Sequence, residues 1–282
     1  MSDVTLDHAT RIGFIGGGNM AHAMIAGLIK RGVAPGAIQV SDPSEAALTR
    51  LRALSGGLGL ATDTNGLLTS VDACVLAVKP QILRRVVSEL DIAGIERMPL
   101  MISIAAGVRA TDIERWLGPD AAVVRAMPNQ PALLGLGVSG AYAGASVTRH
   151  QRSLATDILR AAGDVCWVTD EHAMDSVTAV SGSGPAYFFL LIEAMQDAAV
   201  SLGLTEAQAQ RLVVQTAIGA AAMASADDAD IRALRAGVTS PGGTTDAAIS
   251  HLLAHDLPNL YHEALDAARN RAVELADQAA ED

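Results

Sequence analysis

The sequence predicts an α/β fold with a doubly wound, mainly parallel sheet over residues 1–170, followed by an all-α helical domain over residues 171–282. Two observations lead to this prediction. Short apolar runs alternate with helical patterns in the first part, which is typical of a parallel sheet covered on both faces. In the second part the segments are long, rich in alanine and helical in period, and no convincing strand follows Glu171.

Apolar runs in the first part are expected to form buried strands. The five clearest cover residues 11–16, 37–41, 73–78, 100–105 and 122–127, and two later candidates, one of them a candidate for antiparallel pairing, cover 137–142 and 165–170. Helical periodicity between the strands predicts helices over residues 20–30, 45–54 and 81–90.

Long helices are expected over residues 185–202, 205–225 and 257–279 of the second part. Thr205 followed by Gln208 is a capping box, which predicts a helix start. The stretch from Ala186 to Val200 is apolar around most of its circumference, so it must be buried on nearly all sides. A domain of this size offers limited cover for such a helix. We therefore expect a second copy of the chain to pack against it, as a homodimer at least.

The composition excludes several kinds of partner. The chain has 31 acidic and 20 basic residues, for a net charge of −11, which argues against binding to nucleic acid or an anionic membrane surface. The most apolar stretch carries Glu193 and is too short to span a bilayer, and no secretory signal is visible. Cys74 and Cys166 lie in apolar runs and are expected to be buried strand residues without a disulfide. We expect a cytoplasmic protein with neither a nucleic-acid nor a membrane partner.

A glycine-rich turn follows the first predicted strand. Gly16, Gly18 and Ala21 form the pattern G-x-G-x-x-A at the start of a helix. Gly16 permits a tight turn, Gly18 lets a pyrophosphate approach the backbone, and Ala21 lets the helix pack closely on the strand. This context predicts a dinucleotide-binding Rossmann domain, and the alternative is a tight turn without a ligand.

Asp42 ends the second predicted strand, where an acid accepts hydrogen bonds from the adenosine ribose hydroxyls. A carboxylate there would repel a 2′-phosphate and so favours NADH, and the nearest following arginine is Arg50. The alternative role for Asp42 is a helix cap ahead of Glu45, and one residue can fill both roles.

Lys79 is one of two lysines in the chain and directly follows the strand at residues 73–78. Ligands of open α/β sheets lie beyond the carboxyl ends of the strands, so Lys79 is interpreted as positioning the ribose and phosphates of a cofactor. The alternative is a surface lysine ahead of Pro80. The small residues of the segment S-I-A-A-G, at 103–107, end the next strand and permit a similarly close approach.

The segment V-T-S-P-G-G-T-T-D, residues 238–246, is rich in N–H and O–H donors and carries one charge, Asp246. Gly242, Gly243 and Thr244 can present consecutive N–H groups ahead of a helix, which suits an anion. A helix cap with glycines for turn geometry is the alternative on spacing alone. The histidines near this segment, His251 and His255, are interpreted as a solvated helix end, so no metal site is predicted.

Five segments together resemble pyrroline-5-carboxylate reductases: G-G-G-N-M (16–20), A-V-K-P (77–80), R-A-M-P-N (125–129), S-G-S-G-P-A-Y (181–187) and V-T-S-P-G-G-T-T (238–245). The resemblance covers essentially the whole chain. It implies a Rossmann domain and a helical domain that interlocks into dimers, often assembled further into decamers. It also implies reduction of 1-pyrroline-5-carboxylate to L-proline, the last step of proline biosynthesis, with NADPH as cofactor and NADH possible.

The resemblance assigns cofactor contacts to three segments and to Asn65, which is similar to an asparagine near the adenosine ribose. Thr245 is similar to a threonine that bonds the substrate nitrogen. No role is carried onto Asp228 or Gly237, where some members have an acidic residue and an asparagine. The three segments comprise Ile15, Gly16, Gly17, Gly18, Asn19 and Met20, then Ala77, Val78, Lys79 and Pro80, then Ile104, Ala105 and Ala106.

Reduction of a cyclic C=N bond requires no metal, nucleophile or strong base. The site must hold the carboxylate and supply a hydrogen-bond donor to the nitrogen, and positioning is the larger part of such catalysis. We expect Thr245 to orient the nitrogen and relay a proton. The expected substrate-binding residues are Ser240, Gly242, Gly243, Thr244 and Thr245.

Two other functions remain as alternatives. A β-hydroxyacid dehydrogenase or related imine reductase shares the two-domain plan, but such dehydrogenases use a lysine as general acid and no lysine follows Lys79. A non-catalytic NAD(P)-sensing protein would explain the glycine-rich turn and leave the segment at 238–246 without a role.

Overall fold

The computed structural model describes residues 9–64, 66–92 and 95–281. The chain divides into two compact units, one formed by Met1–Ser183 with Ala268–Asp282 and the other by Gly184–Ala267. The sequence placed the boundary near residue 170, whereas the observed units divide at Ser183 and the end of the last helix rejoins the sheet.

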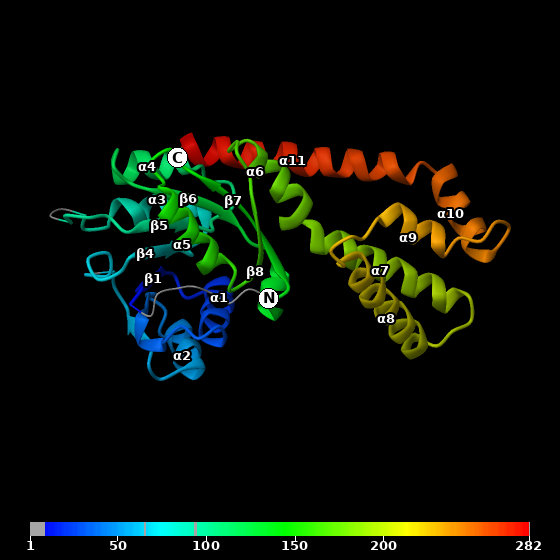
Figure 1. Ribbon diagram of the computed structural model, residues 1–282, viewed down its shortest axis with the longest axis horizontal. Helices are drawn as coiled ribbons and strands as arrows, with labels where there is room; N and C mark the ends of the chain where they lie inside the picture. Colours follow the sequence, from blue (N-terminus) through cyan, green and yellow to red (C-terminus); the bar gives the residue numbers. More distant parts are fainter. Residues whose placement is uncertain (1–8, 65, 93–94, 282) are drawn as a thin grey trace. The chain divides into compact units, whose positions relative to one another are not determined.

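The first unit is built on an eight-stranded sheet with the order β3-β2-β1-β4-β5-β6-β7-β8 (Figure 1). Neighbouring strands are parallel except β6 and β7, which pair antiparallel. The predicted doubly wound α/β fold is confirmed, and so is antiparallel pairing by one late strand, β7; because β8 is parallel to β7, both run opposite to β6. The strands are β1 (Ile12–Ile15), β2 (Ile38–Ser41), β3 (Gly59–Ala61), β4 (Ala73–Leu76), β5 (Leu100–Ser103), β6 (Val123–Met127), β7 (Gly137–Ala143) and β8 (Gly163–Trp167).

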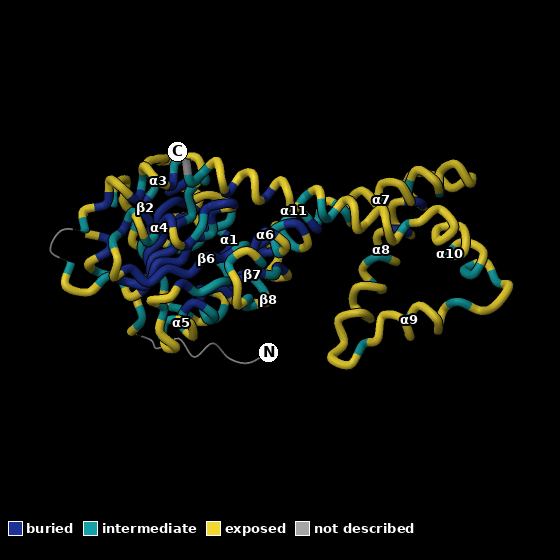
Figure 2. The backbone as a smooth tube through the Cα atoms, turned by 90° about the horizontal axis from the view of Figure 1, so that it is seen from above, coloured by how far each residue is buried: buried dark blue, intermediate teal, exposed yellow. Residues whose placement is uncertain are grey.

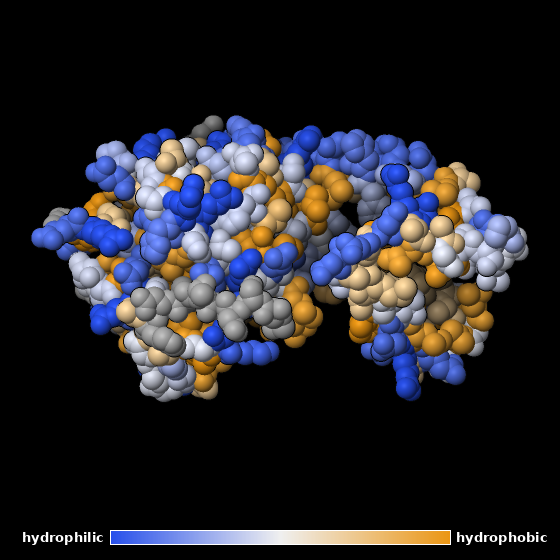
Figure 3. Space-filling model, viewed as in Figure 1, coloured by the Kyte–Doolittle hydropathy of each residue, from blue (hydrophilic) through white to orange (hydrophobic). Residues whose placement is uncertain are grey.

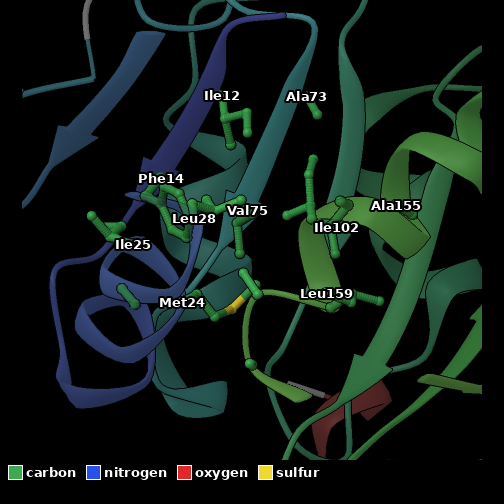
Figure 4. Close-up of a cluster of buried hydrophobic side chains, with 14 of the residues drawn as sticks. Ile12, Phe14, Met24, Ile25, Leu28, Ala73, Val75, Ile102, Ala155 and Leu159 are labelled. Atoms are coloured by element: carbon green, nitrogen blue, oxygen red, sulfur yellow. The ribbon is translucent and has the colours of Figure 1, made fainter. Parts of the chain in front are cut away.

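Helices cover both faces of the sheet because successive side chains of each strand point to opposite sides. Ile12 and Phe14 of β1 join one buried apolar cluster, and Ile15 joins the other. Figure 4 shows the first cluster, in which Met24 and Leu28 of α1 meet the sheet. The helical elements of this unit are α1 (Asn19–Lys30), 3-10 helices at Pro35–Ala37 and Gln130–Leu134, α2 (Glu45–Leu54), α3 (Pro80–Ser88), α4 (Ala110–Leu117), α5 (Arg149–Leu159), α6 (Ala173–Val177) and a π-helix at Thr178–Gly182.

The two cysteines differ in their surroundings. Cys74 lies on β4 in the middle of the sheet and is buried, as expected, and this burial raises the pKa of its thiol. Cys166 is exposed in the single chain, so the expectation that it is buried was wrong. It lies on β8, the last strand of the sheet, where Val165 and Trp167 pack against the core on one face and Cys166 lies on the opposite, exposed face.

The second unit consists of helices α7 (Gly184–Ser201), α8 (Glu206–Ala224), α9 (Ile231–Gly237), α10 (Thr244–Ala254) and the first part of α11 (Leu257–Glu281). The predicted capping box is present, since Thr205 Oγ1 accepts from the Gln208 N–H at 3.3 Å and the Gln208 side chain accepts from the Thr205 N–H at 3.0 Å. The predicted all-α domain is confirmed.

Apolar side chains of the second unit are largely exposed. The helices α8, α9 and α10 are mostly coloured as exposed in Figure 2, and hydrophobic residues gather on the surface of this unit in Figure 3. On α7, Phe188 is 68% exposed and Leu190 is 66% exposed. By length and composition, the helical stretch Ala173–Ser201, which contains Glu193, is long and apolar enough to cross a membrane, so the expectation that this apolar stretch is too short to do so was wrong for the helix as observed. Exposed apolar area of this extent marks a surface that another molecule covers.

The end of α11 belongs to the sheet unit. Ala272 and Ala276 are buried there, and a Cβ added to Gly107 would lie 3.6 Å from the Leu275 side chain. Arg109 forms an ion pair with Asp277 at 2.5 Å, and this hydrogen bond raises the pKa of Arg109. The C-terminal helix therefore supports the loop that follows β5.

Candidate active site

The turn between β1 and α1 requires glycine at position 16. Gly16 has φ of +100°, and a Cβ added there would lie 2.6 Å from the carbonyl oxygen of Ala77. The Gly16 N–H donates to the Ser41 carbonyl at 2.7 Å, and the Ala77 N–H donates to the Ile15 carbonyl at 2.8 Å. The turn is thus fastened to the ends of the neighbouring strands, which is the arrangement that the G-x-G-x-x-A pattern predicts.

The start of α1 fits a phosphate group. Gly18 is the N-cap residue, and a Cβ added there would meet no atom within 4 Å. Among the described residues, the N–H groups of Gly18, Asn19 and Met20 have no hydrogen-bond acceptor. Free first-turn amides and the helix dipole together favour an anion, so these residues suit the pyrophosphate of a nicotinamide dinucleotide.

Asp42 joins the end of β2 to the glycine-rich turn. Its Oδ2 accepts from the Gly17 N–H and its Oδ1 from the Ser44 N–H, both at 2.7 Å. The cap of α2 is Ser44 rather than Asp42, since the Ser44 side chain accepts from the Ala47 N–H. The carboxylate is half-buried and lies beside the turn, so its charge is held at the edge where the predicted ribose site lies.

Two further loops leave the same edge of the sheet, because they also follow the carboxyl ends of parallel strands. The segment Ala77, Val78, Lys79 and Pro80 follows β4, where Lys79 is exposed at the N-cap of α3 and Pro80 starts that helix. The segment Ile104, Ala105 and Ala106 follows β5, and the Ile104 N–H donates to the Leu76 carbonyl at 3.1 Å. Asn65 lies outside the described residues.

Two of the motifs meet through Asn129, a contact that the sequence did not reveal. The buried Asn129 side chain accepts from the Val138 N–H at 3.0 Å and donates to the Ser181 carbonyl at 3.1 Å. It ties the R-A-M-P-N segment to the π-helix, a rare conformation that often occurs at functional sites. Both motifs were visible in the sequence, but no spacing rule pairs residues that lie so far apart in the chain.

A buried ionic cluster fixes the start of α6 against the sheet. Arg125 is 3% exposed and pairs with Glu171 at 3.4 Å and Asp175 at 3.3 Å. Glu171 also accepts from the Ala110 N–H at 2.6 Å. Removing one partner would leave a buried charge unpaired, so the cluster holds these elements in one arrangement.

The loop at residues 238–246 leads into α10 in the second unit. The N–H of Gly242 donates to Asp246 Oδ2 and that of Gly243 to the Ser240 carbonyl, both at 2.9 Å. The N–H groups of Gly242 and Gly243 are therefore used within the loop, whereas the sequence suggested that they are open to a ligand. The N–H groups of Thr244 and Thr245 find no acceptor in the described part of the chain.

The donors of this loop consequently lie at the first turn of α10. Gly243 is the N-cap and has no side chain with which to cap the helix, while Thr245 is half-buried and Ser240 is exposed. A carboxylate suits such a helix start. In the described residues no group of three or more His, Cys, Asp or Glu side chains could hold a metal ion. The ring centroids of His251 and His255 lie 4.2 Å apart, with the rings tilted by 38°.

Two family models match the chain. One, described as pyrroline-5-carboxylate reductase dimerisation, matches residues 171–275, and another, described as NADP oxidoreductase coenzyme F420-dependent, matches residues 11–107. A relative from Pseudomonas aeruginosa described as pyrroline-5-carboxylate reductase is 45% identical over 268 residues, which cover 95% of this chain and 97% of the relative.

Solved structures agree with these matches. A pyrroline-5-carboxylate reductase from Coxiella burnetii is 44% identical, with a TM-score of 0.91 over 95% of this chain and 99% of that one. Pyrroline carboxylate reductase from Plasmodium falciparum, solved with NADP bound, is 28% identical, with a TM-score of 0.80 over 95% of this chain and 99% of that one. The chain therefore belongs to the pyrroline-5-carboxylate reductase family of NAD(P)H-dependent oxidoreductases, which make proline from 1-pyrroline-5-carboxylate.

Proposed function

We propose that this chain reduces 1-pyrroline-5-carboxylate to L-proline with its carboxylate-binding and nitrogen-binding groups at the start of α10. The observation that carries the proposal is the pair of free N–H groups at Thr244 and Thr245, on a helix whose N-cap has no side chain. Two amides and a helix dipole bind a carboxylate without a cation. This suits a chain that has no lysine after Lys79.

The hydroxyl groups of the loop supply the remaining contacts. Thr245 is half-buried on the first turn of α10, and its Oγ1 donates to no acceptor among the described residues. We assign it the hydrogen bond to the substrate nitrogen, which orients the imine and relays a proton. Ser240 offers a second hydroxyl beside the carboxylate site. Gly242 and Gly243 shape the turn, and the Asp246 carboxylate holds it closed through the Gly242 N–H.

The cofactor residues lie in the first unit. Gly18, Asn19 and Met20 supply the amides for the pyrophosphate, Asp42 the acceptor for the adenosine ribose, and Lys79 a cation at the end of β4. Gly16, Gly17 and the segments that follow β4 and β5 let the cofactor approach the backbone closely. The bound cofactor supplies the hydride for the reduction. We propose that NADPH is the cofactor. NADH also serves, because the carboxylate of Asp42 lies close to the turn and favours a ribose without a 2′-phosphate.

The exposed apolar face of the second unit supports a homodimer. The dimerisation match at residues 171–275 covers that face, and Phe188 and Leu190 would be buried in a symmetric interface. We propose that this dimer is the basic assembly, that it is a candidate building block for a decamer, and that the enzyme acts in the cytoplasm.

Recognition of the carboxylate can be tested directly. Oxidation of NADPH and NADH should be measured with 1-pyrroline-5-carboxylate and with 1-pyrroline, which is the same ring without the carboxylate. We expect turnover with the first and at least a tenfold loss in kcat/KM with the second, because two charge-assisted hydrogen bonds are lost. Equal kcat/KM values would overturn the carboxylate site. Cofactor binding without any turnover would support the sensing alternative instead.

A further inference from the structure

Arg50 reaches the cofactor turn from a neighbouring helix. It lies on α2, and its Nη1 donates to the Asn19 side chain at 3.0 Å. Asn19 is the first residue of α1, directly after the G-x-G turn, and α1 and α2 lie near one another at the blue end of the colour range in Figure 1. The guanidinium is therefore held beside the free first-turn amides.

The contact between α2 and the turn is close. A Cβ added to Gly17 would lie 2.9 Å from Leu51 Cδ1, so Leu51 packs under the turn while Arg50, the preceding residue, extends over its edge. The backbone of α2 is thus fixed relative to the turn. Arg50 does not need a large rearrangement to contact a molecule that lies on the turn.

The charge of Arg50 is not neutralised by the protein. No carboxylate in the described part of the chain lies within ion-pair distance of its guanidinium, although Arg52 on the same helix pairs with Glu45 at 3.2 Å. The acid beside the turn, Asp42, is engaged by the Gly17 and Ser44 amides instead. An exposed, unpaired guanidinium next to an anion-binding helix start matches the geometry of a phosphate, which arginine binds through two parallel N–H groups.

We propose that Arg50 binds a phosphate group of the nicotinamide dinucleotide and offsets the negative charge of Asp42, which would otherwise disfavour the 2′-phosphate of NADPH. This proposal rests on the use of NAD(P)H by the family. The phosphate chemistry has two sources in this cofactor, the pyrophosphate shared by NADH and NADPH and the 2′-phosphate that NADPH alone carries.

The test compares Arg50→Gln with Arg52→Gln, a matched control on the same helix. Dissociation constants for NADPH and NADH would be measured by nicotinamide fluorescence, and those for adenosine 2′,5′-bisphosphate and ADP by calorimetry. We expect Arg50→Gln to weaken NADPH binding about tenfold, with a loss that shrinks at high salt, while Arg52→Gln leaves binding unchanged. Arg50→Lys should retain part of the affinity, since lysine keeps the positive charge but cannot form the two parallel N–H bonds of a guanidinium.

The pattern of losses distinguishes the two phosphates. A loss for NADPH and the bisphosphate, with NADH and ADP unchanged, assigns Arg50 to the 2′-phosphate. An equal loss for all four assigns it to the adenosine 5′-phosphate of the pyrophosphate, which all four share. A loss for all except the bisphosphate assigns it to the other phosphate of the pyrophosphate. Unchanged binding in Arg50→Gln, or an equal loss in Arg52→Gln, overturns the role of Arg50 and leaves the reductase function standing. A wild-type protein that binds none of the four would overturn both.

Discussion

The carboxylate of Asp42 accepts a hydrogen bond from the backbone N–H of Gly17, with 2.7 Å between the nitrogen and Oδ2. The same side chain therefore shapes the glycine-rich turn and places a negative charge at the end of β2. A ribose with two free hydroxyls tolerates that charge, whereas a 2′-phosphate is repelled by it.

This relationship predicts the effect of Asp42→Ser. The serine hydroxyl can still accept one bond, but the negative charge is removed. We expect the ratio of kcat/KM for NADPH to that for NADH to rise about tenfold, an effect of about 1.4 kcal/mol. Initial rates with both cofactors measure the ratio. An unchanged ratio would mean that Asp42 does not face the adenosine ribose.

Thr245→Ala tests the hydrogen bond to the substrate nitrogen. Removing one positioned donor should lower kcat about 100-fold and leave the dissociation constant of NADPH nearly unchanged. Thr239→Ala is the control in the same loop, because its hydroxyl donates to the Arg235 carbonyl at 2.6 Å and has no proposed contact with substrate. Similar losses in both variants would mean that the loop is disturbed as a whole and that Thr245 has no special role.

Leu190→Asp tests the apolar face of α7. Burying an unpaired carboxylate in an interface costs several kcal/mol, so the dimer dissociation constant should rise at least 100-fold. Light scattering coupled to size-exclusion chromatography measures the change, and Leu190→Met, which keeps the surface apolar, is the control. If Leu190→Asp stays dimeric at micromolar concentration, the dimer uses another surface.

The main strands could be predicted because each is an apolar run between turn residues, and burial on both faces leaves little else for such a run to form. β3 was not predicted, since Gly59–Ala61 is three residues long and has no buried side chain. Cys166 was wrongly expected to be buried, because an apolar run does not reveal that only one face of its strand, the face of Val165 and Trp167, is covered.

The site was predictable where it depends on backbone geometry near in sequence. The turn at Gly16 is such a case, because its positive φ follows from the glycine pattern, whereas its close approach to Ala77 was not predicted. Contacts between distant segments were not predictable. The bond from Asn129 to Ser181 and that from Arg50 to Asn19 depend on tertiary packing. The use of the Gly242 amide by Asp246 is a local contact, but it depends on a side-chain rotamer that the sequence does not reveal.

Gly27→Ala is predicted to destabilise the sheet unit. A helical glycine replaced by alanine normally gains up to about 1 kcal/mol. Here the added Cβ would lie within the contact radius of the Ala161 carbonyl oxygen, and overpacking costs about 1–3 kcal/mol. The clash is with backbone, which cannot swing away, so we expect a net loss of stability. Urea denaturation at fixed protein concentration measures it, with Gly56→Ala, whose Cβ meets open space, as the control. A stabilised Gly27→Ala variant would show that α1 and the loop after α5 can separate.

Glu114→Gln is predicted to stabilise the protein at neutral pH. The Oε1 atom of Glu114 is buried without a hydrogen-bond partner among the described residues, and desolvation, followed by repulsion from Glu171, raises the pKa of this carboxyl. A carboxyl whose pKa is higher in the folded than in the unfolded chain holds its proton more tightly when folded. The free energy of unfolding therefore falls as pH rises from the ordinary pKa of glutamate, about 4.5, through the raised folded pKa.

The glutamine variant has no proton to lose, so its advantage in unfolding free energy should be absent near pH 4 and present near pH 7.5. Urea denaturation at the two pH values measures the difference between variant and wild type. Exposed Glu96→Gln controls for the removal of one negative charge from a chain with a net charge of −11. A Glu114→Gln variant that loses stability at pH 7.5 would mean that the charged carboxylate makes a favourable contact, and that the buried oxygen is not the dominant cost at this position.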